Sequence, residues 1–265
     1  MSLQHFYLDE QVLADEVGGP FPLRLAADDA KHARVLRLAP GERIAVVDAV
    51  RDYFACEIVA FDGVLPVVRI AQRFERADAG PSVVLVQGLA KGDKMETVIR
   101  HATELGVSAF VPLACDRSVV RLDAKKAAAK AGRWRAIAKS AAMQSGQPAV
   151  PDVREPAGLR EACALLADAD ALLVCWEEAP GASRLDVALD RALGGGRAAQ
   201  GARVAVVVGP EGGLAEREVE ALLACNPRSS LVSLGPSILR TETAGIVAPA
   251  LALYELERRA RAGAL

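Results

Sequence analysis

Cysteine and histidine are sparse in this chain of 265 residues. No two cysteines form a Cys-x-x-Cys pair, none has a histidine as a neighbour, and the histidines are dispersed. These spacings argue against a zinc site and a disulfide framework, so we expect no metal. Thiols spaced in this way are typical of a protein kept reduced in the cytoplasm. The residues are Cys56, Cys115, Cys163, Cys175, Cys225, His5, His32 and His101.

Long apolar runs are also missing. No run approaches the roughly 18 residues that a membrane span requires, and we find no signal peptide, so we expect no membrane partner. Hydrophobic residues still make up 52% of the chain, which excludes global disorder. Aromatic residues contribute only 4%, so nucleic-acid recognition by stacking on several rings is not expected. No Gly-x-Gly-x-x-Gly run follows the first strand of the predicted α/β region, which argues against a dinucleotide site.

Charge is nearly balanced, with a formal net charge of −2, and the sum gives no support for nucleic-acid binding. One segment differs from the rest. Between Arg117 and Lys139 the sequence carries eight basic residues and a single acid, Asp123. Such a cluster can pair with backbone phosphates, or it can form a solvated face of a surface helix. The sequence leaves both interpretations open.

The first 75 residues predict a small β-rich domain. Strands are expected at residues 44–48, 53–60 and 64–71, joined by hairpin turns at Arg51-Asp52 and Asp62-Gly63. A short helix over residues 28–38 interrupts them. Strands that close around one helix predict a small β-barrel. Residues 73–81 are charged and include Gly80-Pro81, which is typical of a linker. We therefore expect domains at residues 1–75 and 76–265.

From Ser82 onward, strands and helices alternate, which predicts an α/β domain with a parallel sheet. One helix is expected to begin at Asp93, with Glu96 in capping-box spacing. Residues 194–201 are glycine-rich and predict a surface loop. The expected strands are residues 83–87, 109–112, 172–176, 204–208 and 231–234, and the other helices are residues 124–143, 159–167, 215–224 and 241–259.

Two strand-to-helix turns lie close together in the C-terminal third. Residues 209–213 read Gly-Pro-Glu-Gly-Gly, and residues 234–244 read Leu-Gly-Pro-Ser-Ile-Leu-Arg-Thr-Glu-Thr-Ala. Glycine lets backbone N–H groups approach a ligand closely, and open α/β sheets bind ligands at the carboxyl ends of strands. The first turn alone can be a mere connection. The second places four polar residues before an apolar helix, more than a helix start needs, and so favours a binding site.

Together these motifs resemble the bacterial 16S ribosomal RNA uridine-N3 methyltransferases of the RsmE type, members of the knotted SPOUT superfamily. The resemblance covers about residues 5–254. It implies a PUA-like N-terminal barrel, a SPOUT domain with a deep trefoil knot, S-adenosylmethionine as cofactor, and a homodimer acting on 16S rRNA of the 30S subunit. The supporting segments are Lys-Gly-Asp-Lys-Met-Glu at residues 91–96, Ala-Thr-Glu-Leu-Gly-Val at 102–107, residues 112–119, His-Ala-Arg-Val-Leu-Arg-Leu at 32–38, and Pro-Gly-Glu at 40–42.

The resemblance also implies a cofactor site made by three loops, which follow residues 172–176, follow residues 204–208, and run from Leu234 through Thr243. In the family the last helix helps to pair two subunits. Here its apolar residues cover much of the circumference, which favours burial or a subunit contact. These residues are Ile246, Val247, Leu251, Leu253 and Tyr254. The cofactor-binding residues so predicted are Trp176, Gly209, Pro210, Glu211, Gly212, Leu234, Gly235, Ile238, Leu239 and Thr243.

Methylation of uridine N3 requires removal of the imide proton, which leaves only well above neutral pH. Arg240 is the predicted catalytic residue, because a guanidinium stabilises the deprotonated base. Glu211 or Glu242 can act as general base if burial raises its pKa, and each can instead cap a helix or anchor a loop. We expect RNA contacts from basic side chains, each of which can also be a solvated surface charge. These are Arg24, His32, Arg34, Arg37, Arg117 and Arg121.

The chain departs from the family pattern at two places. Ser237 stands where the family usually has arginine, and Gln147 ends a Gln-Ser-Gly-Gln run where the family tends to have Gln-Ser-x-Arg. Both changes remove a cation near the expected site and put RNA positioning in doubt more than cofactor binding. Two alternatives stay open: a non-catalytic RNA-binding or ribosome-assembly protein, and a SPOUT enzyme that methylates ribose 2′-hydroxyls.

Overall fold

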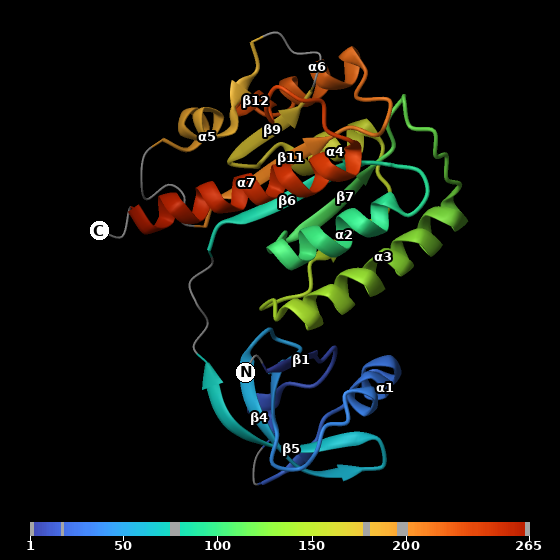
Figure 1. The fold of residues 1–265 in the computed structure, drawn as a ribbon, viewed down its shortest axis with the longest axis vertical. Helices are drawn as coiled ribbons and strands as arrows, with labels where there is room; N and C mark the ends of the chain where they lie inside the picture. Colours follow the sequence, from blue (N-terminus) through green and yellow to red (C-terminus); the bar gives the residue numbers. More distant parts are fainter. Residues whose placement is uncertain (1–2, 17–18, 75–79, 177–180, 195–200, 263–265) are drawn as a thin grey trace. The chain divides into compact units, whose positions relative to one another are not determined.

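The computed structural model describes residues 3–16, 19–74, 80–176, 181–194 and 201–262. The chain divides into two compact units (Figure 1). The first contains Met1–Ala77 and Ala142–Val150, and the second contains Asp78–Ala141 and Pro151–Leu265. The predicted boundary at residue 75 falls outside the described residues, as does most of the predicted loop at residues 194–201.

The first unit contains a five-stranded sheet. Its elements are β1 (Gln4–Tyr7), a 3-10 turn (Leu13–Asp15), β2 (Phe21–Pro22), α1 (Ala27–Val35), β3 (Arg43–Val47), β4 (Tyr53–Asp62) and β5 (Leu65–Phe74). The strands lie in the order β1-β3-β4-β5-β2. β1 and β3 are parallel, and the other neighbours are antiparallel. Phe6, Ile44, Phe54 and Ile58 are fully or almost fully buried in the core of this unit.

The alternating pattern located β3, β4 and β5 to within a few residues. It did not locate β1 and β2, which are short and lie at the two edges of the sheet. β1 is buried through His5, Phe6 and Tyr7, and it gains its partner only by parallel pairing with β3. Pairing between distant segments is invisible to a local pattern.

The second unit is built on a seven-stranded parallel sheet. Its strands are β6 (Ser82–Gly88), β7 (Ala109–Leu113), β8 (Asp152–Val153), β9 (Ala171–Cys175), β10 (Ser183–Arg184), β11 (Arg203–Val208) and β12 (Ser229–Ser233). They lie in the order β10-β12-β9-β11-β6-β7-β8, and every neighbouring pair is parallel. The prediction of a parallel α/β domain is confirmed.

Helices cover both faces of this sheet (Figure 1). They are α2 (Lys94–Leu105), α3 (Ala124–Ser145), α4 (Leu159–Leu166), α5 (Leu185–Leu193), α6 (Glu216–Ala224) and α7 (Thr241–Ala262). On β6, Val83 and Leu85 pack with α2, α5 and α7, whereas Val84 and Val86 pack with α4 and α6. The central strands read as continuous apolar runs because successive side chains alternate between these two buried faces.

The predicted capping box at the start of α2 is wrong. Asp93 occupies the cap position but makes no side-chain cap hydrogen bond. The Glu96 carboxylate instead accepts a hydrogen bond of 2.7 Å from Arg133 on α3. A long-range ion pair between α2 and α3 has replaced the local hydrogen bond to the backbone that the spacing indicated.

Membrane spans and metal clusters are both missing from the described part of the chain. No helix in those ranges is both long and apolar enough to cross a membrane. Among the same residues, no three histidine, cysteine or acidic side chains are grouped so that they could hold a metal ion.

Candidate functional site

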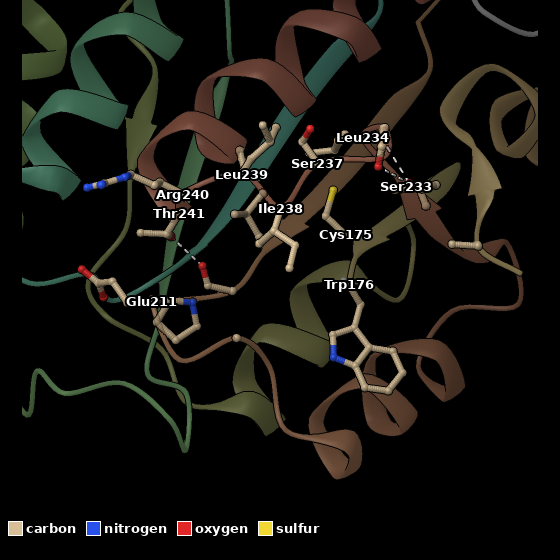
Figure 2. A pocket seen from close by; sticks show the side chains of 18 of the residues that line it. Cys175, Trp176, Glu211, Ser233, Leu234, Ser237, Ile238, Leu239, Arg240 and Thr241 are labelled. Carbon is tan, nitrogen blue, oxygen red and sulfur yellow. Dashed lines mark hydrogen bonds between the residues drawn. The ribbon is translucent and has the colours of Figure 1, made fainter. Parts of the chain in front are cut away.

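A cavity of about 410 Å³ lies at the carboxyl ends of β9, β11 and β12. The segments that follow these strands contribute its walls, and Lys94 and Thr241 add the first turns of α2 and α7. Figure 2 shows Arg240 and Glu211 on one side of the cavity and Trp176 on the opposite side. The two turns singled out in the sequence therefore meet around one cavity, at the edge of the sheet where ligands bind in open α/β folds.

The turn after β11 is held by close backbone contact with the neighbouring strand. Gly88, at the end of β6, packs against Gly209 and Pro210 so tightly that a Cβ atom at Gly88 would lie 2.4 Å from the Pro210 nitrogen. Only glycine permits this approach. The end of β6 thus fixes the position of the turn that forms one wall of the cavity.

A buried hydrogen-bonded link connects this turn to the start of α7. The Thr241 hydroxyl donates to the Gly209 carbonyl over 2.6 Å, and Gln87 Nε2 donates to Thr241 Oγ1 over 2.9 Å. Thr241 is buried, as is Gln87. In the sequence Thr241 stands out only as one of several polar residues before a helix. The structure gives it the specific task of tying the second turn to the first.

Lys94 forms ion pairs with both candidates for the general base, Glu211 and Glu242. Its Nζ lies 3.1 Å from Glu211 Oε1 and 3.1 Å from Glu242 Oε2, and the three side chains are each only 22–23% exposed. A lysine in the first turn of a helix is unfavourable for the helix dipole, so these two carboxylates explain its position. The sequence motif at residues 91–96 contained Lys94, but nothing local indicated that it would reach the cavity.

These contacts keep both carboxyl groups ionised. For Glu211, burial acts to raise the pKa, but hydrogen bonds from its own backbone, Lys94 and Lys91 together outweigh it, and the pKa is lowered. A backbone hydrogen bond at Glu242, together with Lys94 and Arg240, lowers the pKa of Glu242. The condition attached to the general-base hypothesis, a pKa raised by burial, is met by neither residue.

Replacing Lys94 with methionine is expected to loosen both turns and lower thermal stability. Paired Glu211 and Glu242 stabilise the fold above their ordinary pKa of 4.5, and this contribution disappears as pH falls through their lowered pKa values. Glu242 and Glu211 raise the pKa of Lys94 above its ordinary value of 10.5, so the charged Lys94 stabilises the fold fully below pH 10.5. The Tm difference between wild type and Lys94→Met should therefore be largest between about pH 4.5 and 10.5, and it should become smaller outside that range. A difference independent of pH would contradict the ion-pair account.

Most of the predicted cofactor-binding residues line the cavity. Ile238 is 84% exposed there, and Leu239 is partly buried beside it. Two predicted residues are not among the lining groups. Gly212 packs on the backbone of Arg117, and Thr243 is exposed on α7. Those that line it are Trp176, Gly209, Pro210, Glu211, Leu234, Gly235, Ile238 and Leu239.

The cavity also has lining residues that the sequence did not single out for binding. Besides Lys94, they include Cys175, Ser233 and Ser237. Ser237, at the position of one missing family arginine, is exposed at the cavity. The other departure, Gln147, lies in the first unit, where its carbonyl accepts a hydrogen bond from the Tyr7 hydroxyl.

The predicted RNA-contacting residues divide into two groups. In the second unit, Arg121 donates to the carbonyls of Cys115 and Asp116, and Arg117 donates to the Gly212 carbonyl, so both guanidinium groups make internal contacts. In the first unit, Arg24 lies 3.7 Å from Glu16. His32, Arg34 and Arg37 are exposed at the end of α1.

The basic segment at residues 117–139 is likewise not a uniform free face. Arg133 pairs with Glu96, Arg135 donates to the Val153 carbonyl, and Lys126 pairs with Asp123. Several of its cations therefore serve the fold of the second unit. This favours the structural interpretation for those residues over phosphate binding.

Comparison with known proteins gives consistent matches. Residues 78–253 match the family model of the RNA methyltransferase domain. The ribosomal RNA small subunit methyltransferase E of Bacillus subtilis is 35% identical over 238 residues, covering 88% of this chain and 90% of that protein. The protein of the same name from Mycobacterium tuberculosis is 35% identical, covering 83% and 82%. A crystal structure of the Neisseria gonorrhoeae protein of that name, bound to S-adenosyl methionine, superposes with a TM-score of 0.76, 28% identity, and coverage of 96% and 98%.

Proposed function

Because the chain belongs to the family of ribosomal RNA small subunit methyltransferases E, we propose that it transfers a methyl group from S-adenosylmethionine to N3 of a uridine in 16S rRNA of the 30S subunit. The observation that carries the proposal is the cavity that the segments after β9, β11 and β12 form together. It lies beside a predicted catalytic arginine, Arg240, and within a domain whose relatives are named as methyltransferases.

The residues present fit S-adenosylmethionine. At about 410 Å³ the cavity falls within the range of about 300–1,000 Å³ that small-molecule sites occupy. Trp176 lines it, and its buried Nε1 has no acceptor among the described residues, which leaves a donor for a ligand. Ile238 and Leu239 supply apolar walls, and the backbone of Leu234 and Gly235 supplies polar groups for an adenine edge.

The bound cofactor supplies an electrophilic methyl group on a sulfonium. The chain must then favour the anionic form of uridine, and Arg240 is the residue for this task. It lies at the cavity, where its guanidinium stabilises negative charge on the deprotonated base. Glu211 and Glu242 are weak proton acceptors, because their pKa values are lowered and both are paired with Lys94. They act as anchors for the two turns, and the imide proton leaves to solvent.

Finer features of the fold belong to the same proposal. We propose that residues 1–75 form a PUA-like RNA-binding domain and residues 76–265 a SPOUT domain with a trefoil knot. The proposed knot rests on membership of the family, and the sheet order places a crossover from β11 past β9 to β12 in this part of the chain. A homodimer through α7 is supported by Leu251 and Tyr254, which are 43% and 71% exposed.

The test is methyl transfer from labelled S-adenosylmethionine to 30S subunits from a strain that lacks this modification, followed by nucleoside mass spectrometry. We expect 3-methyluridine. A methyl group that stays with the sugar on fragmentation would instead identify a ribose 2′-O-methyltransferase. Cofactor binding without any methylated nucleoside would identify a non-catalytic RNA-binding protein, and would implicate Ser237 and Gln147 in the lost turnover.

A further inference from the structure

The first unit carries a second cavity, of about 420 Å³, lined by residues at the end of α1 and at the tip of the β4–β5 hairpin. Arg34, Arg37, Phe61 and Val64 are among the residues that line it. The predicted RNA contacts on α1 did not include the hairpin. The structure therefore adds an aromatic ring and an apolar side chain to two of the predicted arginines.

Two apolar side chains of the hairpin tip are exposed at this site. Phe61 is 36% exposed and Val64 is 50% exposed, on either side of the turn at Asp62-Gly63. The charged residue of the turn, Asp62, is itself exposed. Large apolar groups placed together on a surface mark an interaction site more often than groups scattered singly.

The two arginines supply positive charge without internal partners. In the described part of the chain, neither Arg34 nor Arg37 forms an ion pair or a side-chain hydrogen bond, and both are exposed. Arg37 also adopts a left-handed backbone conformation, with φ of 53°, at the position after the C-cap of α1. Glycine or asparagine usually occupies such a position, so Arg37 stands there at a conformational cost, as Arg51 does in the turn between β3 and β4, where φ is 64°.

An aromatic ring and two arginines that line one cavity match the chemistry of an unpaired nucleotide. Single-stranded RNA is recognised by stacking of a base on an aromatic ring, with cations at the adjacent phosphates. We propose that this cavity binds one unpaired nucleotide of RNA, with its base on Phe61 and Val64 and its flanking phosphates on Arg34 and Arg37. The proposal rests on the proposed function for the identity of the nucleic acid, and it names a substrate-binding subsite in the first unit, made of residues that do not line the cofactor cavity.

The experiment uses the full-length protein and fluorescence anisotropy with 5′-labelled hexauridylate over a range of salt concentrations. Phe61→Ala should weaken binding about 5- to 150-fold, the loss expected for one stacked base, and leave the salt dependence unchanged. Phe61→Tyr should restore binding. The double variant Arg34→Ala/Arg37→Ala should lower the slope of log K against log salt by about 1.4, or about 0.7 for each phosphate on a single strand.

Arg51→Ala is the matched control, because Arg51 is exposed on the same unit in the turn between β3 and β4, at the other end of β4. It should bind like wild type. If Phe61→Ala and the double variant both bind hexauridylate as tightly as the wild type does, the proposed subsite is wrong. This conclusion holds whatever the methylation assay gives. The same losses in a protein that methylates no nucleoside would support the subsite and count only against the proposed function. Thermal unfolding of each variant excludes loss of the fold.

Discussion

Arg240→Ala is expected to lower kcat for methyl transfer to 30S subunits about 10²- to 10³-fold, the loss typical when one charge-stabilising donor is removed. Arg240 lines the cavity beside the turn that Glu211 and Lys94 anchor, but it makes none of the hydrogen bonds that hold that turn. Removing it should therefore leave the cofactor Kd within about twofold of wild type. Calorimetric titration with S-adenosylmethionine and single-turnover kinetics separate the two quantities.

Two variants sharpen this test. Arg240→Lys keeps the charge but loses the planar guanidinium, so it should recover part of the rate. Arg191→Ala removes an exposed arginine of α5, a helix whose residues do not line the cavity, and should leave kcat unchanged. Equal loss of kcat and cofactor affinity in Arg240→Ala would show that the residue holds the cofactor site and does not stabilise the reacting base.

The parts of the fold and site that could be predicted are those with local signals. Alternation and continuous apolar runs located the main strands, and the glycine turns before polar helix starts located two of the cavity's three walls, those after β11 and β12. α5 is absent from the predicted helices, although Leu185, Ala188 and Leu189 are spaced for one helical face and all three are buried.

The parts that could not be predicted depend on pairing between distant segments. The contact of Lys94 with Glu211 and Glu242 joins three elements, and backbone hydrogen bonds together with this contact lower the pKa of both acids, against the expected effect of burial. The meeting of Phe61 with Arg34 and Arg37 has the same origin, because a hairpin tip and a helix end lie together only after the sheet has formed. Local rules describe neighbours in sequence, whereas both of these groups are neighbours in space.

The close approach at Gly88 leads to the second large expected effect. A Cβ atom there would lie 2.4 Å from the Pro210 nitrogen, 2.5 Å from Pro210 Cδ and 2.8 Å from the Gly209 carbonyl carbon. These are backbone and ring atoms, which cannot move aside without displacing the whole turn. Gly88→Ala is therefore expected to lower the free energy of unfolding by about 1–3 kcal/mol, as overpacking does.

The same displacement should weaken S-adenosylmethionine binding at least about tenfold, because Gly209 and Pro210 line the cavity and Gly209 accepts the Thr241 hydrogen bond. Urea unfolding and calorimetric titration measure the two effects. Gly132→Ala is the matched control: Gly132 lies exposed within α3, and a Cβ atom there would meet no other atom within 4 Å, so alanine should add about 0.5–1 kcal/mol of stability. Gly88→Ala with wild-type stability and cofactor affinity would show that the turn after β11 does not depend on this contact.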